Sequence, residues 1–356
     1  GRPKPVETGF YNKVSKVSVL SAPASFRPMS QTLVPHFDDA ALQGLIHEGC
    51  GARYGDDPHG PQVLFDPPVG APADDPADAL LSGGLMLLAD RIGSRQIWDR
   101  VIAAGQVLIN KHYMPQHGLF RDIYDPAKHE FVVPNPFRTK NDIGGRPLVE
   151  DSVLLRLFEK TGDKRFLDVH VAISRTLTAD QDPPGNWMDY GPCNRAKGVF
   201  HPRHTYWWGL PLLDTYRATG EEEFLKTAIA SGEFCIEAMR SDGGWIRGLY
   251  LDGKTDCFGH ATSGSACAAI LWVELFKQTN DPRWLAPIHK ALTYCQNMQM
   301  TNPADKNLKG VILEKVLPPD GTDRNPYYIR DLGTIFYIIA GLEYLQLAKG
   351  RSWGPG

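Results

Sequence analysis

The sequence lacks the features that mark several large functional classes. Its formal net charge is −3 over 356 residues, so it has no basic excess of the kind that neutralises nucleic-acid phosphates. No apolar run approaches the roughly 20 residues that cross a bilayer. The six cysteines form no C-x-x-C pair, which gives no support to a structural zinc site or a disulfide scaffold. We therefore expect neither a nucleic-acid-binding protein nor a membrane protein.

Familiar cofactor and nucleophile motifs are also missing. There is no G-x-G-x-x-G, Walker loop, G-x-S-x-G elbow or H-E-x-x-H, so nucleotide, serine-hydrolase and zincin functions have no support. His201 and His204 have an i, i+3 spacing, but Pro202 lies between them and no third ligand is near in sequence. We expect no metal and no cofactor. The chain begins at Gly1 without a basic-then-apolar leader, so we expect any signal peptide to be already removed or never present.

A seven-residue motif recurs through the chain. Thr161-Gly-Asp-Lys-Arg-Phe-Leu167 returns as Thr219-Gly-Glu-Glu-Glu-Phe-Leu225 and as Thr279-Asn-Asp-Pro-Arg-Trp-Leu285, at offsets of 58 and 60 residues. Gly or Asn at the second position suits a left-handed helix end, and the acid after it suits the start of the next helix. The motif therefore predicts the turn of a repeated helical hairpin.

The helices on either side of this motif differ in pattern. The preceding ones, Leu148–Lys160, Arg203–Ala218 and Ala261–Gln278, are apolar almost all round and should be buried, whereas the following ones are amphipathic. Gly-and-aromatic segments such as Gly185–Trp187 and Gly243–Trp245 come next. The sequence predicts an all-α fold, an (α/α) toroid of five or six hairpins with short β segments at the loops. An open solenoid of TPR type is the alternative, although its repeats are only ~34 residues long.

The ends of the chain have a different composition. Residues 1–76 are rich in Pro, Gly and Asp with one short helical pattern near Asp38–Cys50, and we expect an N-terminal arm that packs on the main body. The toroid domain is expected over 77–348, with a C-terminal tail at 349–356. A terminal helix at Ile329–Ala348 could meet the one at Asp38–Cys50, which favours a closed ring.

Three smaller expectations concern single residues in the helices. Cys235, Cys267 and Cys295 fall within apolar helical patterns and are expected in the core. Trp208 is expected there too. Pro287 lies within an outer helix and is expected to kink it.

Ionisable and aromatic residues gather where the inner helices begin. In a toroid the loops that lead into inner helices face one end of the ring, so several repeats deliver these groups to one place, where we expect the active site. The residues are Glu150, Asp151, His201, Arg203, His204, Tyr206, His260, Tyr327, Tyr328 and Arg330. Each has a structural alternative, such as acids that favour a helix start or aromatics that only pack. Trp187 and Trp245 are candidates for stacking on sugar rings, and Trp207 is a candidate for stacking or for the core.

A connection of about 35 residues, 112–147, stands between two helical regions. It is rich in cations, and structureless loops of this length are usually functional or disordered. Its basic residues are His117, Arg121, Lys128, His129, Arg138, Lys140 and Arg146. We expect either a solvated loop or a basic lid over an anionic chain.

The helical repeat resembles the (α/α) toroid, or six-hairpin, carbohydrate-active enzymes, and within them the alginate-lyase-like polysaccharide lyases. His204-Thr205-Tyr206-Trp207 is similar to the His-Ser-Tyr-Trp stretch that opens an inner helix in those enzymes, and Arg247-Gly248-Leu249-Tyr250 is similar to their following Arg-Gly and Tyr. Arg203 stands where the family usually has Asn. The hydrolase relatives place an Asp near His204, which is missing here, and the acids that could serve instead are Asp151, Asp189, Asp256 and Asp331.

The resemblance implies a secreted or periplasmic enzyme that cleaves an acidic polysaccharide or oligosaccharide by β-elimination. Arg247 or Arg203 would grip the uronate carboxylate, because Arg donates two parallel hydrogen bonds. His204, His260, Tyr206 or Tyr250 would move the proton at C5. The alternatives are a six-hairpin glycoside hydrolase with paired carboxylates and a non-catalytic helical scaffold.

Overall fold

The computed structural model describes residues 85–125, 128–132, 139–191, 193–245, 249–250, 260–303, 305–316, 328–329 and 331–349. These residues belong to two compact units. We call the described residues up to 200, together with 207–231, the N-terminal unit, and residues 201–206 with those from 232 onward the C-terminal unit. The expected N-terminal arm, its helix near Asp38–Cys50 and the C-terminal tail after 349 lie outside the described residues.

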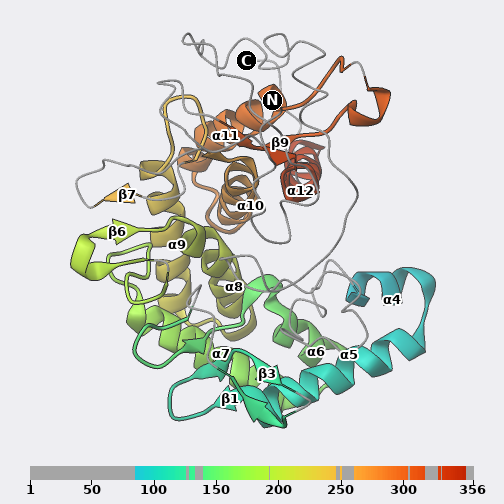
Figure 1. Ribbon diagram of the computed structural model, residues 1–356, viewed down its shortest axis with the longest axis vertical. Coiled ribbons are helices and arrows are strands. Elements are labelled where there is room, and N and C mark those ends of the chain that lie inside the picture. The colour runs from blue at the N-terminus through green and yellow to red at the C-terminus, as the bar shows by residue number, and fades with distance from the viewer. Residues whose placement is uncertain are drawn as a thin grey trace, which may run out of the picture. The chain divides into compact units, whose positions relative to one another are not determined.

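Helices dominate both units (Figure 1). The α-helices are α4 (Leu87–Ile92), α5 (Arg95–Val107), α6 (Val153–Thr161), α7 (Lys164–Asp180), α8 (Arg203–Thr219), α9 (Glu222–Glu237), α10 (Thr262–Thr279), α11 (Leu285–Asn297) and α12 (Asp331–Lys349). The short strands are β1 (Tyr113–Met114), β2 (Leu119–Arg121), β3 (Tyr124–Asp125), β4 (Glu130–Phe131), β5 (Gly145–Arg146), β6 (Val199–Phe200), β7 (Leu249–Tyr250), β8 (His260–Ala261), β9 (Leu313–Val316) and β10 (Tyr328–Ile329). The predicted all-α class with short β segments is confirmed.

The recurring motif forms the same turn three times, between α6 and α7, α8 and α9, and α10 and α11. Its threonine hydroxyl donates to the carbonyl four residues back, at 2.7–2.8 Å, and accepts the backbone N–H two residues on. The next residue is left-handed, with φ of 71° at Gly162, 76° at Gly220 and 56° at Asn280. Asp163 and Asp281 then accept a backbone N–H of the following helix. Each turn thus ends one helix and begins the next, as predicted.

Burial follows the predicted division into inner and outer helices within each unit. In the C-terminal unit, α10 buries 13 of its 18 residues, whereas α11 buries five of its 13. In the N-terminal unit, α6 buries four of nine residues and α7 six of 17. Cys235, Cys267 and Cys295 are buried thiols, as expected.

Pro287 does not kink its helix. Because α11 begins at Leu285, Pro287 lies in the first turn, where a backbone N–H has no partner within the helix. A separate 3-10 turn, Pro282–Trp284, precedes it. The expected kink is wrong because the sequence pattern placed the start of the helix too early.

Helices of the C-terminal unit approach closely at a glycine. A Cβ atom on Gly232 of α9 would lie 2.4 Å from Leu275 Cδ1 and 3.0 Å from the Trp284 ring. The Gly232 carbonyl also accepts the indole N–H of Trp272 at 2.9 Å. The missing side chain lets α10 and the start of α11 pack directly on the α9 backbone.

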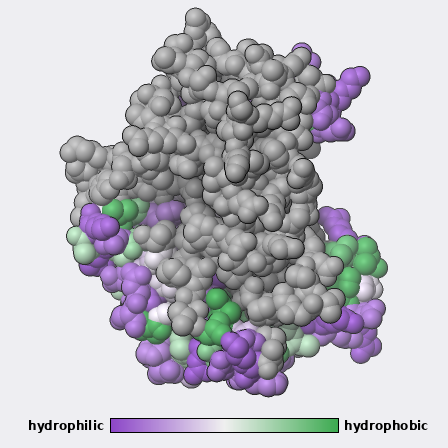
Figure 2. All heavy atoms as spheres, viewed as in Figure 1, coloured by the Kyte–Doolittle hydropathy of each residue, from purple (hydrophilic) through white to green (hydrophobic). Residues whose placement is uncertain are grey.

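Apolar side chains are exposed on the first and last helices of the described series. On α4, Leu88 is 45% exposed and Ile92 62%, and Figure 2 shows hydrophobic surface in the region of this helix. The exposed residues of α12 share one face at helical spacing: Ile335, Ile338, Ile339, Leu342 and Leu345. This is expected where hairpins cover one another, because an end helix has a neighbour on one side only. None of the described helices is long and apolar enough to cross a bilayer.

The connection over 112–147 is largely folded rather than structureless. Strands β1, β2 and β5 form one antiparallel sheet, and β3 pairs with β4 in a hairpin. Arg146 on β5 makes a buried ion pair with Asp122 at 3.2 Å, which takes one of the expected lid cations into the interior. Arg138 lies outside the described residues.

A buried histidine joins α7 to α8. His170 Nε2 lies 3.0 Å from the Thr215 hydroxyl, which donates to the carbonyl of Pro211 at 2.8 Å and lies 2.9 Å from the Ser174 hydroxyl. Since Thr215 has one proton to give, its oxygen accepts from His170 and Ser174. Burial lowers the pKa of His170 from 6.5 to about 4.

We predict that this histidine makes the protein less stable in mild acid. The unfolded chain binds a proton below pH 6.5, whereas the folded protein does so only below about pH 4. The contribution of buried, neutral His170 to the free energy of unfolding is therefore fully present above pH 6.5. It falls by up to about 3 kcal/mol as the pH drops to 4. Urea unfolding of the wild type and His170→Gln at pH 7.5 and 4.5 checks this, with exposed His117→Gln as the control. A stability difference between wild type and His170→Gln that does not change with pH would contradict it.

Candidate functional site

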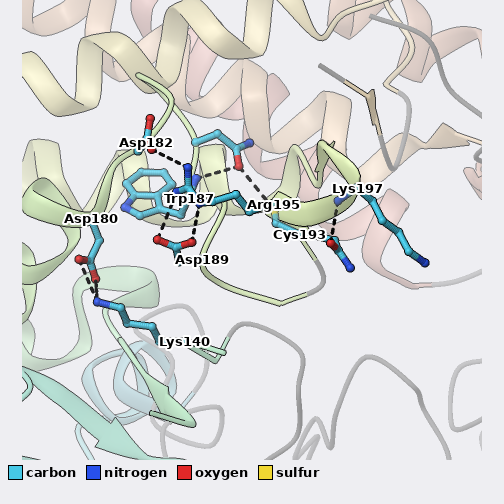
Figure 3. Close-up of polar contacts among 10 residues, drawn as sticks. Lys140, Asp180, Asp182, Trp187, Asp189, Cys193, Arg195 and Lys197 are labelled. Atoms are coloured by element: carbon cyan, nitrogen blue, oxygen red, sulfur yellow. Dashed lines mark hydrogen bonds and ion pairs between the residues drawn. The ribbon is translucent and has the colours of Figure 1, made fainter. Parts of the chain in front are cut away.

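Carboxylates cluster in the N-terminal unit around one arginine (Figure 3). Arg195 Nη1 lies 2.7 Å from Asp182, and its Nε and Nη2 lie 2.8 and 3.2 Å from the two oxygens of Asp189. All three side chains are about half exposed or more. The hydrogen bonds from Arg195 lower the pKa of Asp189, so this carboxylate stays ionised at neutral pH.

A second cation holds another acid of this cluster. Lys140 Nζ lies 2.9 and 3.0 Å from the oxygens of Asp180, and the Tyr190 hydroxyl donates to the same carboxylate at 2.7 Å. The backbones of Lys140 and Tyr190 pair in an isolated β-bridge. Burial raises the pKa of Tyr190 well above 10. Lys140, expected in a basic lid, is therefore neutralised by an acid at the end of α7.

Trp187 is a core residue and not a stacking surface, which corrects the expectation for this side chain. It is fully buried, and its indole N–H donates to the carbonyl of Leu177 at 2.7 Å. Its ring meets Trp208 edge to face at 5.1 Å, and Trp208 also meets Tyr190 at 5.0 Å. Trp208 is buried as predicted, and Trp207 is only partly buried. The buried rings of Trp187, Tyr190 and Trp208 pack together, and the Tyr190 hydroxyl joins them to Asp180 of the carboxylate cluster.

The backbone is strained where α6 begins. Leu148, Asp151 and Ser152 are left-handed, with φ of 45°, 54° and 53°. Residues other than glycine in this region cost of order 1–3 kcal/mol each, and such strain concentrates at functional sites. The Ser152 hydroxyl donates to Asp214 of α8 at 2.7 Å, which anchors the segment.

This geometry corrects the expected helix start. Glu150 and Asp151 do not lie in the first turn of an α-helix, because α6 begins at Val153 after a 3-10 turn. Asp151 is exposed and Glu150 is partly exposed. The segment that leads here also reaches the carboxylate cluster, since Asn141 N donates to the carbonyl of Asp189 at 2.9 Å.

Two histidines expected in the site, His201 and His204, are buried in the C-terminal unit. His204 is 0% exposed and His201 8%, and their ring centroids lie 5.9 Å apart. Tyr206 is buried and packs on Trp245 with 5.3 Å between ring centroids. Trp245, expected at the surface for stacking on a sugar, is 3% exposed and belongs to the core. These four expected site residues thus form two ring pairs, both in the interior.

The other expected site residues are placed by the backbone or lie outside the description. Strand β9 pairs with both β8 and β10, so His260 and Tyr328 belong to one small sheet just before α10 and α12. For Arg203, Tyr250, His260 and Tyr328 only the backbone is described, while Arg247, Tyr327 and Arg330 lie outside the described residues. Among the residues that are described, no group of three or more His, Cys, Asp or Glu side chains is placed to hold a metal ion.

Sequence reasoning found part of the carboxylate cluster and missed the rest. Asp189 was named as a substitute carboxylate, but Asp180, Asp182 and Arg195 were not. Asp182 lies two residues after the end of α7, and Asp189 lies two residues after Trp187. The signal was the position of these acids at both edges of a Gly-and-aromatic segment.

Comparisons with known proteins identify the fold. The chain is similar to cellobiose 2-epimerase from Spirochaeta thermophila, with a TM-score of 0.60, 13% identity and coverage of 76% of this chain and 70% of that one. It is also similar to a D-mannose isomerase (TM-score 0.58, 15% identity, 76% and 71% covered) and to an unsaturated glucuronyl hydrolase specific for heparin (0.57, 12%, 78% and 76%). No protein-family model matches the chain, and no curated protein does. The fold is therefore that of the (α/α) toroid proteins, as the repeat predicts.

Proposed function

We propose that this protein is a carbohydrate-active enzyme that hydrolyses a glycosidic bond in a uronic-acid-containing oligosaccharide. The observation that carries the proposal is Asp151, an exposed carboxylate held in a left-handed conformation at the start of an inner helix. Residues other than glycine seldom adopt this conformation, and such backbone strain concentrates at functional sites. Hydrolysis of glycosides requires such carboxylates.

Two features favour hydrolysis over the β-elimination that the sequence resemblance implies. Of the four residues expected to move the C5 proton, the two whose side chains are described, His204 and Tyr206, are buried, and Tyr206 packs against Trp245. In addition, a heparin-specific unsaturated glucuronyl hydrolase is among the proteins of similar fold. In contrast, the carboxylate of Asp151 is exposed and that of Asp189 is about half exposed.

The two carboxylates suit different tasks. Arg195 keeps the pKa of Asp189 low, so Asp189 is a base or a charge that stabilises the oxocarbenium-like transition state. Asp151 is then the general acid that protonates the departing oxygen.

Product analysis tests the proposal. We expect the protein to release new reducing ends from uronyl oligosaccharides, with no gain of ultraviolet absorbance on saturated substrates and a loss of absorbance on substrates that end in an unsaturated uronate. Elimination would instead create the unsaturated sugar and raise the absorbance of a saturated polyuronate. That gain, or the absence of any product from both substrates, would contradict hydrolysis.

A further inference from the structure

The β3–β4 hairpin has an aromatic face and an acidic face. Tyr124 lies opposite Phe131, and Asp125 lies opposite Glu130. Because neighbouring residues of a strand point to opposite faces, the two rings share one face and the two acids the other. The Tyr124 and Phe131 ring centroids are 5.2 Å apart at 63°. The acidic side chains are thereby kept from the aromatic face.

Two cations lie over these rings. Lys111 Nζ is 3.3 Å from the centroid of Tyr124, and Arg121 Cζ is 4.8 Å from that of Phe131. Both side chains are exposed. Within the part of the chain that the structure describes, neither forms an ion pair, whereas nearby Lys128 lies 3.4 Å from Asp125 on the other face. The rings hold both cations in place by cation–π attraction.

A histidine beneath the rings holds this arrangement together. His112 Nδ1 lies 3.0 Å from the carbonyl oxygen of Arg121 and donates to it. The imidazole also meets Phe131 edge to face at 5.0 Å. Burial lowers the pKa of His112, so the ring is neutral near pH 7. We call the two rings with the described cations that lie over them, Lys111 and Arg121, the Lys111–Arg121 platform.

We propose that the Lys111–Arg121 platform binds the carboxylate groups of an acidic glycan. The inference rests on the proposed function in one respect, that this glycan is also the substrate. The planar donors of Arg121 match a carboxylate, and Lys111 adds a point charge for the carboxylate of a nearby sugar unit. Two cations are too few for tight binding to nucleic acid, which depends on many phosphate contacts.

Binding measurements with three polyanions test the platform. The probes are polygalacturonate, which has carboxylates only, dextran sulfate, which has sulfates only, and poly(U). We expect the double variant Lys111→Gln/Arg121→Gln to bind polygalacturonate about tenfold more weakly than wild type at low salt, because two charge-assisted contacts are lost. The variant Lys111→Arg/Arg121→Lys keeps both charges and one guanidinium, so it should lose less affinity than the double Gln variant.

A matched control separates the platform from general charge. Lys164→Gln/Arg175→Gln removes two exposed cations from the same unit, each already paired with an acid, Lys164 with Asp168 at 2.7 Å and Arg175 with Glu221 at 2.9 Å. The platform proposal would be overturned if both double variants weakened binding equally or if the wild type did not bind polygalacturonate. It would also be overturned if the wild type bound dextran sulfate or poly(U) more tightly than polygalacturonate. Hydrolysis of a uronyl disaccharide is measured separately, so its absence would overturn the proposed function without deciding the platform.

Discussion

Replacing Asp151 with Asn is expected to lower the turnover of uronyl oligosaccharides by about 10²- to 10⁴-fold, the usual contribution of a general acid. The carboxyl group would no longer protonate the departing oxygen. An amide has nearly the same shape and can still accept hydrogen bonds, so substrate binding should change less than turnover. Steady-state kinetics therefore should show a fall in kcat with a nearly constant KM.

The Asp151→Asn substitution should change the charge of the side chain and little of the local backbone conformation. Asp151 has φ 54°, and Asn tolerates the left-handed region at least as well as Asp does. The side chain is exposed, so the substitution changes little buried surface. The variant should therefore keep its unfolding midpoint.

Asp168→Asn is the matched control for this variant. Asp168 is an exposed acid of α7 that is paired with Lys164, and removing its charge should leave turnover within about twofold because such surface pairs contribute little. An Asp151→Asn protein with wild-type turnover would remove Asp151 from the mechanism. A loss of turnover together with a lowered unfolding midpoint would assign it a structural role instead.

The helical hairpins were predictable because their signals are local. The turn motif contains the groups that form the turn. These are a threonine that donates a hydrogen bond to the carbonyl four residues back, a residue suited to positive φ, and an acid that caps the next helix. The contrast between all-round and one-sided apolar patterns likewise predicts which helix of each pair is buried. These features need no knowledge of distant contacts, and α6 through α11 are confirmed.

The candidate site was less predictable because side-chain exposure depends on tertiary packing. A tryptophan beside glycines suits a sugar platform and a core equally well in sequence, and only the positions of Leu177 and Trp208 decide the case of Trp187. Similarly, Arg195 and Asp182 are 13 residues apart, and a fold is needed to bring them within 2.7 Å. The strands of the 112–147 connection could not be predicted from the sequence because each is only two or three residues long.

The replacement of Trp187 by Ala should lower the free energy of unfolding by about 3–5 kcal/mol, since a fully buried indole leaves a large cavity. The lost indole N–H also leaves the Leu177 carbonyl without the bond it accepts at 2.7 Å, which adds to the cost. This is a large share of the 5–15 kcal/mol that stabilises an ordinary domain. Urea denaturation followed by circular dichroism measures the change.

Trp207→Ala is the matched comparison for this variant, because it removes the same side chain from a partly buried position 20 residues further on. We expect it to cost less than half as much, because less of its surface is withdrawn from water. If Trp187 were instead a platform for sugar rings, Trp187→Ala would keep its unfolding midpoint and raise KM for oligosaccharides. A stable variant with a raised KM would therefore show that Trp187 binds substrate. A variant that unfolds at lower urea, with an unchanged KM in the folded fraction, would show that Trp187 belongs to the core next to Asp180 and Asp189.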